Sequence, residues 1–136
     1  VGVLQLEEAQ IRLKANTRYP AFFSYEKIRS SLIAGLEKAG FEYQECLSMP
    51  PLDIPRDSPL VRKLMESYQE VTGDREHHAF SSGGATYACS IPNAVSFGPL
   101  FPGETELAHE ANECLSVQSL ERMTEIYISA LEKLLE

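Results

Sequence analysis

A proline-rich segment interrupts the chain and limits the folds that the chain can adopt. The segment MPPLDIPRD, residues 49–57, contains three of the eight prolines. A proline fixes its own φ and has no backbone N–H to donate, so such a segment suits neither the interior of a helix nor a central strand. The segment also lacks hydrophobic periodicity. We therefore place a linker at residues 51–57, with one domain over residues 1–50 and another over residues 58–136.

The residues before the linker show the periodicities of two strands, a helix and a third strand. Residues 3–6 and 9–19 read as a β-hairpin, because apolar and polar side chains alternate along the second of these strands. Residues 24–39 carry apolar side chains at helical spacing, with a serine at the start and a glycine just after the end. Residues 41–48 alternate more weakly and read as a short strand. This β-β-α-β order corresponds to half of a ferredoxin-like layer of helix on antiparallel sheet.

The polar face of the second predicted strand contains the first candidate binding residues. Arg12 and Lys14 are expected on a solvated sheet surface. Asn16 and Arg18 differ because they lie together at the end of the strand, next to a loop. From the residues alone, that position is their only distinction.

The residues after the linker read as two helices separated by loops and short strands. Residues 58–72 have a serine N-cap, a proline at the first helical position and a glycine that stops the helix. Residues 117–135 form a longer helix with an acidic, solvated face. Its apolar stripe is expected to comprise Leu120, Met123, Ile126, Tyr127, Ala130, Leu131 and Leu134. Residues 77–80 and 93–100 read as short strands, so the fold class is α/β.

A glycine-rich loop precedes the second of these short strands. In SSGGATY, Gly83 and Gly84 are followed closely by Thr86. Glycines let backbone N–H groups approach an anion or a developing oxyanion closely, but paired glycines also mark ordinary turns. The loop is no phosphate-binding P-loop, because the lysine that should follow is missing.

A lone histidine stands near the end of an unusual stretch, FGPLFPGETELAHEANE at residues 97–113. The stretch begins apolar, is punctuated by glycine and proline, and turns acidic around His109. A neutral imidazole is a good zinc ligand, and Glu110 or Glu113 could orient it. A lone histidine is, however, more often structural, and no HxD, HExxH or CxxC pattern supplies further ligands. From the residues alone, both roles stay open.

The composition argues against several classes of function. With 12 basic and 20 acidic residues the net charge is −8, and no basic stripe suits nucleic acid. No apolar run approaches the ~20 residues of a membrane span, and the first residues lack a secretory signal pattern. Three widely spaced cysteines favour a reducing cytoplasm over a disulfide scaffold. We therefore expect a cytoplasmic protein without nucleic-acid or membrane partners.

Four short motifs follow one another along the chain. They are NTRYP at residues 16–20, GGATYA at residues 83–88, FGPLFP at residues 97–102 and AHEANE at residues 108–113. The residues, order and spacing of these motifs resemble those of the co-catalytic zinc aminopeptidase, dipeptidase and deacylase family. That family includes carboxypeptidase G-type enzymes, aminoacylase and succinyl-diaminopimelate desuccinylase, and the likeness is greatest to its PepV-type dipeptidases.

The resemblance implies a role for each candidate residue. His109 would be the last ligand of a two-zinc site. Glu113 would contact His109 and orient it without binding the metal itself. Arg18, with Asn16 beside it, would come from the family's lid domain and hold the free carboxylate of the substrate. A planar, permanently charged guanidinium suits that task. The same pocket would be lined by Gly83, Gly84 and Thr86.

The resemblance also implies a reaction and an architecture. The reaction is hydrolysis of a peptide or N-acyl amide bond of a small substrate, with zinc, or else manganese or cobalt, as cofactor. Residues 1–50 would be the second half of a ferredoxin-like lid, and residues 58–136 the C-terminal piece of the catalytic domain of a two-domain zinc exopeptidase. The remaining ligands and the general base would lie outside this sequence. The chain is thus expected to be an inactive fragment with no catalytic residue, whose full-length protein forms a homodimer through the lid.

Two departures from the family pattern and two alternatives remain. Ala85 replaces the third glycine of the family's loop, and Cys89 stands where an arginine is often found, so the hydrolase class is better supported than dipeptide specificity. One alternative is a non-catalytic α/β interaction module that dimerises through an unpaired edge of residues 9–19. The other is a cysteine nucleophile at Cys89 with His77 or His78, although no orienting carboxylate is evident.

Overall fold

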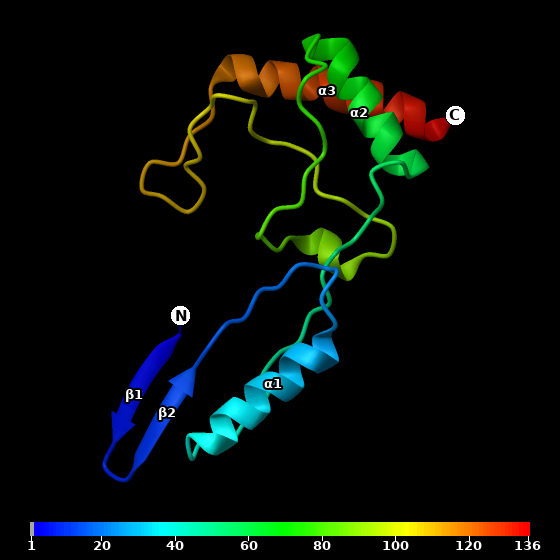
Figure 1. The fold of residues 1–136 in the computed structure, drawn as a ribbon. Coiled ribbons are helices and arrows are strands. Elements are labelled where there is room, and N and C mark those ends of the chain that lie inside the picture. Colours follow the sequence, from blue (N-terminus) through cyan, green and yellow to red (C-terminus); the bar gives the residue numbers. More distant parts are fainter. Residues whose placement is uncertain (1) are drawn as a thin grey trace. The chain divides into compact units, whose positions relative to one another are not determined.

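The structure, a computed structural model, describes residues 2–136 and is an α/β chain with a single small sheet (Figure 1). Its elements are β1 (Val3–Glu7), β2 (Gln10–Lys14), α1 (Tyr25–Lys38), α2 (Pro59–Thr72), the 3-10 turn η1 (Tyr87–Ser90) and α3 (Val117–Leu135). The chain divides into two compact units, one ending at Leu52 and the other running Asp53–Glu136. The assignment of these units to a lid and a catalytic domain stays a prediction.

β1 and β2 form the predicted antiparallel hairpin, with Val3 opposite Lys14 at its open end. β2 nevertheless ends at Lys14, so the strand predicted over residues 9–19 is wrong in its second half. A strand continues only while a neighbour exchanges hydrogen bonds with it, and among the described residues the outermost pair of this ladder is Val3 with Lys14. Asn16 and Arg18 consequently lie in an irregular segment after the strand.

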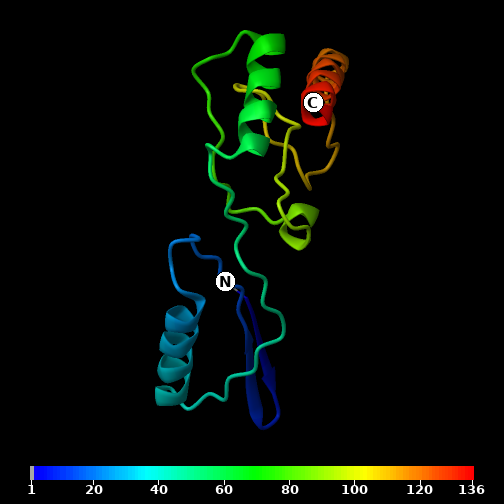
Figure 2. The same ribbon diagram turned by 90° about the vertical axis from the view of Figure 1, so that its right-hand side faces the viewer.

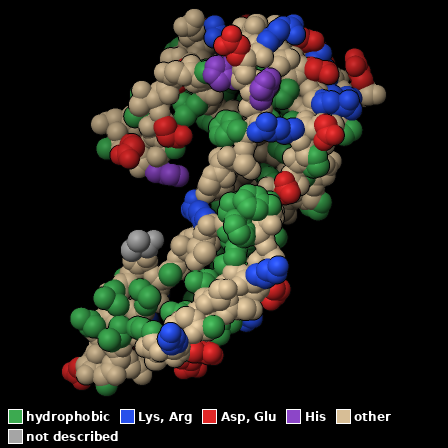
Figure 3. Space-filling view, in the orientation of Figure 1, with side chains coloured by type: hydrophobic (Ala, Val, Ile, Leu, Met, Phe, Trp, Pro, Cys, Tyr) green, Lys and Arg blue, Asp and Glu red, His purple; other side chains and the backbone are tan. Residues whose placement is uncertain are grey.

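One face of the hairpin is apolar and exposed. Leu4 lies opposite Leu13 and Leu6 opposite Ile11, so four aliphatic side chains share a face. Each is about half exposed or more, up to 76% for Leu6. Figure 3 shows hydrophobic side chains gathered over the two strands. No residue between positions 2 and 52 is buried, so this unit has no core of its own within the described residues.

α1 begins after Ser24 and ends at Lys38, close to the bounds predicted from residues 24–39. Gly40 follows with φ of +81°, the left-handed conformation that ends many helices. The helix and its terminal signals are therefore confirmed, although the Ser24 side chain makes no capping hydrogen bond.

Residues 41–48 do not form the predicted strand. Glu45 attaches this segment to α1 instead, because its carboxylate accepts hydrogen bonds from the Tyr25 hydroxyl and, at 3.1 Å, from Arg29 Nε. Within the described residues no strand pairs with the backbone of this segment. The first unit is thus β-β-α followed by irregular chain, and the ferredoxin-like lid stays a prediction.

α2 and α3 pack against each other and form the core of the second unit (Figure 1, Figure 2). The buried apolar side chains are Val61, Leu64, Ala88, Met123, Ile126 and Ala130. Ser67 is fully buried on α2, and its hydroxyl donates to the Lys63 carbonyl at 3.0 Å, which satisfies it. Among residues 2–136, no helix combines the length and the apolar character that a membrane crossing demands.

α2 begins and ends where its capping residues predict, and α3 begins after a serine that caps it. The Ser58 hydroxyl accepts a hydrogen bond from the Val61 N–H at 3.3 Å, and Gly73 ends α2 with φ of +74°. At the start of α3, the Ser116 hydroxyl accepts from the Ser119 N–H at 2.9 Å. Local signals near the helix ends were therefore sufficient to define α2 and α3.

The apolar stripe of α3 is narrower than predicted. Met123, Ile126 and Ala130 are buried, whereas Leu120 and Leu131 are 54% and 61% exposed. At 3.6 residues per turn, these two leucines are rotated by about a quarter of a turn from the buried line. Their assignment to the buried stripe is wrong for the described residues.

The short strands predicted over residues 77–80 and 93–100 are also wrong, because both segments are irregular. Short apolar runs become strands only where another strand pairs with them. Within the described part of the chain the only sheet is β1–β2. His77 and His78 are exposed.

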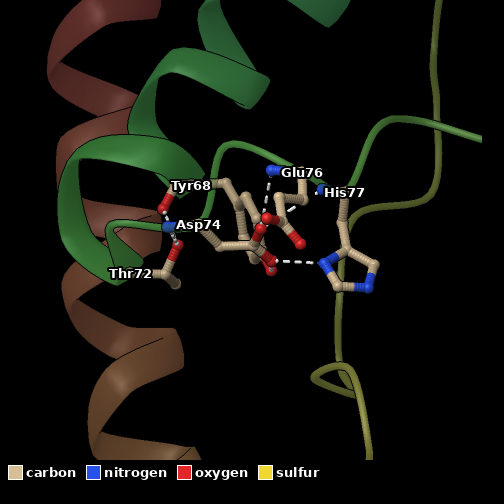
Figure 4. Close-up of polar contacts among 5 residues, drawn as sticks. All are labelled: Tyr68, Thr72, Asp74, Glu76 and His77. Atoms are coloured by element: carbon tan, nitrogen blue, oxygen red, sulfur yellow. Dashed lines mark hydrogen bonds and ion pairs between the residues drawn. The ribbon is translucent and has the colours of Figure 1, made fainter.

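Asp74 organises the turn after α2 (Figure 4). Its Oδ1 accepts hydrogen bonds from the backbone N–H groups of Glu76 and His77 at 3.0 and 3.2 Å. Its Oδ2 accepts from the Tyr68 hydroxyl at 2.6 Å and lies 2.7 Å from His77 Nδ1. The hydrogen bond from the Tyr68 hydroxyl is the main reason that the pKa of Asp74 lies well below its usual range. The hydrogen bonds from the backbone N–H groups of the turn lower this pKa further. Burial and the Asp74 carboxylate raise the pKa of Tyr68 to about 12.

An Asp74→Asn substitution should lower the thermal unfolding midpoint at neutral pH and flatten its acid dependence. Folding depresses the Asp74 pKa below its usual 3.8, so the stability contribution is complete above pH 3.8 and is lost as the pH falls toward the depressed value. Unfolding midpoints of the complete protein from neutral to strongly acidic pH measure this, with exposed Asp53→Asn as the control. Superimposable profiles for wild type and Asp74→Asn would contradict the assignment.

Candidate functional site

The segment that carries the candidate histidine, residues 97–113, is attached to α3 at two places. At the first, the Tyr127 hydroxyl donates to the Phe97 carbonyl at 2.8 Å, and the two rings lie 5.9 Å apart. Gly98 has φ of +93°, and a Cβ added there would lie 2.5 Å from the Tyr127 hydroxyl oxygen. Contact with α3 therefore requires the glycine of the FGPLFP motif.

Glu104 makes the second attachment. Its Oε2 accepts a hydrogen bond from the Phe101 N–H at 2.9 Å, and its Oε1 accepts one from the Ser119 hydroxyl. Both hydrogen bonds lower the pKa of Glu104 and keep the carboxylate ionised, and the one from the Phe101 backbone has the larger effect. Ser119 lies in the first turn of α3, where a negative charge interacts favourably with the helix dipole. The segment is thus held on a helix that belongs to the packed core.

His109 occupies the third position of a tight turn. The turn is closed by a 3.0 Å hydrogen bond from the Glu110 N–H to the Leu107 carbonyl, and His109 has φ of +68°. The next turn places Asn112 at φ +63°. Glycine adopts this left-handed conformation most readily, and asparagine and histidine adopt it more often than most other side chains do. The turn therefore accommodates His109, and its exposed imidazole is presented from a fixed backbone position.

His109 could supply one ligand to a metal ion. The side chain is exposed, so the imidazole is accessible to a ligand. Glu113 lies beside it, but its Oε2 accepts a hydrogen bond from the His109 backbone N–H at 3.2 Å and so stabilises the turn. Its support of the imidazole ring stays a prediction. In the part of the chain that the structure describes, no three His, Cys, Asp or Glu side chains are grouped to hold a metal ion.

Thr86 fixes the end of the glycine-rich loop where it enters η1. Its Oγ1 accepts a hydrogen bond from the Ala88 N–H at 3.2 Å and lies 2.7 Å from Ser96 Oγ. Both hydroxyl-bearing residues are exposed, whereas Ala88 is buried. The Thr86 hydroxyl is therefore ordered by neighbours and still accessible from solvent.

The fold of the described residues does not require glycine at Gly83 or Gly84. Neither has a positive φ. A Cβ added at Gly83 would meet nothing within 4 Å, and one at Gly84 would meet only Ser82 Oγ at 3.4 Å. This differs from Gly98, where a neighbouring side chain excludes any substituent. The two loop glycines leave open space that a ligand could enter.

Arg18 and Asn16 lie in the first unit, whereas the other candidate residues lie in the second. Both are exposed, in the irregular chain between β2 and α1. Tyr19 links this segment to α1, because its ring stacks on that of Tyr25 with the centroids 6.5 Å apart. The segment therefore presents a cation and an amide near the start of α1.

The cysteine nucleophile alternative gains no support. Cys89 is half-buried and, like the other two cysteines, is a free thiol. Within the described residues no hydrogen bond joins it to His77 or His78, and His77 pairs with Asp74 instead. A thiolate nucleophile needs a base within hydrogen-bonding reach, and the contacts of Cys89 do not include one.

Three residues that position the candidate site were not identified from the sequence. They are Ser96, Glu104 and Tyr127. Ser96 directly precedes the FGPLFP motif and Glu104 follows it after one residue, so closeness to a motif is an available signal. Tyr127 is 30 residues from its partner Phe97, and only the fold brings them together.

Comparison with known proteins gives consistent matches over nearly the whole chain. A family model described as "Peptidase family M20/M25/M40" matches residues 2–133. A "Putative dipeptidase" of Bacillus subtilis (strain 168) is 36% identical over 135 residues, which cover 98% of this chain and 28% of the relative. "Putative dipeptidases" of Staphylococcus aureus strains USA300 and NCTC 8325 / PS 47 are each 32% identical over 135 residues, covering 98% of this chain and 29% of the relative. The chain thus spans less than a third of the length of these relatives. No solved structure matches it significantly.

Proposed function

The chain belongs to the peptidase family M20/M25/M40, and from this premise we propose that it is part of a cytoplasmic zinc-dependent dipeptidase or related amidohydrolase. The substrate would be a small peptide or N-acyl amino acid with a free carboxylate. The observation that carries the proposal is His109, an exposed imidazole held at φ +68° on a segment fixed to α3. The hydrogen-bonded turn fixes the backbone of this exposed donor, which suits a metal ligand.

Zinc is the metal we propose for His109. A neutral imidazole nitrogen is a common zinc ligand, and the exposed ring presents one. The other ligands of a two-zinc site would come from parts of the protein outside this sequence, so this chain alone would be inactive. When bound, such ions act as Lewis acids that polarise the scissile carbonyl. The turn stabilised by Glu113 would hold the backbone of His109 in one conformation.

Recognition of the substrate's carboxylate is proposed for Arg18, with Asn16 beside it. A guanidinium is always charged and can donate two parallel hydrogen bonds to a carboxylate. Both side chains are exposed in the segment next to α1, which suits contact with a small ligand. In the second unit the donor would be the Thr86 hydroxyl, and Gly83 and Gly84 would line the same pocket, although the Gly84 N–H already donates to Ser82 Oγ at 3.2 Å. The open space at these glycines supports close approach of an anion.

Removal of metal should abolish hydrolysis by the complete protein that contains this chain. Chelator dialysis followed by assays with a set of dipeptides and N-acyl amino acids measures this, and added zinc, manganese or cobalt should restore activity. Calcium is the control, because as an oxygen-preferring ion it should not restore activity. Hydrolysis that persists without metal, or no hydrolysis of any of these substrates, would contradict the proposal.

A second candidate function is favoured by the surface of the hairpin. Its apolar face is exposed, and β1 and β2 each have an unpaired outer edge within the described residues. A non-catalytic module could dimerise there by extending the sheet. Metal analysis separates the two candidates, since a pure interaction module would bind no zinc. A homodimer formed through this unit is compatible with either function.

A further inference from the structure

Two hydroxyl groups meet at the end of the glycine-rich loop, with Thr86 Oγ1 and Ser96 Oγ 2.7 Å apart. We propose that Ser96 is a positioning residue: it donates its proton to Thr86 and thereby makes the Thr86 hydroxyl a hydrogen-bond donor to the substrate's carboxylate. The inference rests on the proposed function and assigns Ser96 a part in substrate binding.

Counting protons and lone pairs distinguishes the two directions of this hydrogen bond. A threonine hydroxyl has one proton and two acceptor lone pairs. The Ala88 N–H already occupies one lone pair of Thr86 at 3.2 Å. If Ser96 donates, the second lone pair is also occupied, and the remaining capacity of Thr86 is to donate its own proton. If Thr86 donates to Ser96 instead, it can only accept from a ligand.

The charge of the proposed ligand selects between these directions. An ionised carboxylate is an acceptor only, so it can bind Thr86 only when Thr86 donates. Hydrogen bonds to a charged acceptor are about twice as strong as neutral ones, and a chain of such bonds reinforces itself. Binding of a carboxylate would therefore align the two protons in the order Ser96 to Thr86 to ligand.

The backbone around Ser96 is well placed for this task. Ser96 directly precedes Phe97, whose carbonyl accepts the 2.8 Å hydrogen bond from Tyr127 on α3. Thr86 is held on its other side by Ala88, which is buried. Both hydroxyls thus sit next to anchored positions, while Thr86 and Ser96 themselves are exposed. A group that orients a binding residue acts best from such a supported position.

The test uses steady-state kinetics of the complete protein. Ser96→Ala should raise KM for a dipeptide with a free carboxylate about fivefold or more while kcat changes less than about twofold, because the lost interaction contributes equally to ground-state and transition-state binding. A substrate whose carboxylate is amidated should show no such rise. Ser96→Thr, which keeps the hydroxyl, should restore KM. Ser90→Ala, an exposed serine at the end of η1, is the matched control.

A double-mutant cycle completes the test. If Ser96 acts through Thr86, the variant with both residues changed to alanine should bind no worse than Thr86→Ala alone. Additive effects, or a KM for Ser96→Ala equal to that of Ser90→Ala in an active enzyme, would overturn the positioning role and leave the proposed function intact. A wild-type protein that hydrolyses no peptide or N-acyl amino acid would overturn both.

Discussion

Replacing His109 by glycine should lower kcat/KM for peptide hydrolysis by the complete protein at least about a hundredfold without reducing its stability. Loss of even an indirect partner of a metal ligand typically costs 10–100-fold, and loss of a ligand itself should cost more. Stability should stay equal or rise, because glycine adopts the φ of +68° without strain. Steady-state kinetics and thermal unfolding of the same preparations measure both effects.

Asn112→Gly is the matched control for this substitution. Asn112 lies in the adjacent turn with φ of +63°, so glycine relieves the backbone there in a comparable way. This variant should keep its activity. If His109→Gly remained as active as Asn112→Gly, the imidazole would have no part in the chemistry, and His109 would be only a turn residue.

Replacing Arg18 by alanine should raise KM for substrates with a free carboxylate about 30-fold or more. Truncating one partner of a hydrogen-bonded charge pair at an interface costs 2–5 kcal/mol or more, and about 2 kcal/mol corresponds to that factor. Arg18→Lys should recover only part of the loss, since an ammonium retains the charge but cannot form the two parallel bonds of a guanidinium. Kinetics with free and amidated forms of one dipeptide isolate the carboxylate contribution.

Arg12→Ala provides the control for the effect of charge alone. Arg12 is an exposed arginine of the same unit, opposite Gln5 in the hairpin, and it has no proposed role. Its removal should change KM little. An Arg18→Ala variant that discriminated between free and amidated substrates as well as wild type does would show that another residue binds the carboxylate.

Helices were predictable from this sequence because their signals are local. Ser58 and Gly73 lie at the ends of α2 and determine its bounds through hydrogen bonding and backbone conformation. Ser116 does the same at the start of α3. The face that each helix buries was less predictable. Leu131 satisfies the helical spacing, yet it is exposed because packing against α2 selects a neighbouring line of side chains.

Strands were less predictable because a strand depends on a partner that may be distant in sequence. The hairpin was found, since β1 and β2 are joined by a short turn. Residues 41–48 and 93–100 carry apolar side chains in strand-like runs, but they are irregular where no strand pairs with them among the described residues. Whether these segments form strands depends on pairing with another strand and not on their composition.

Site residues that belong to a sequence motif can be predicted from the sequence. Contacts that only the fold creates cannot. His109 and Thr86 were identified by their motifs. The left-handed φ of His109 and the hydrogen bond between Thr86 and Ser96 come from backbone geometry and tertiary contact. Tyr127 illustrates the limit, because helical spacing suggested a buried apolar side chain while its hydroxyl in fact anchors Phe97.

We propose that His109 binds a metal ion, and the metal content of the complete protein measures this most directly. Wild type, His109→Gly and Asn112→Gly should be purified in parallel, equilibrated at the same buffered concentration of free zinc and analysed for bound metal per chain. We expect wild type and Asn112→Gly to bind equal amounts of zinc and His109→Gly to bind measurably less. Equal zinc content in all three proteins would contradict this proposal.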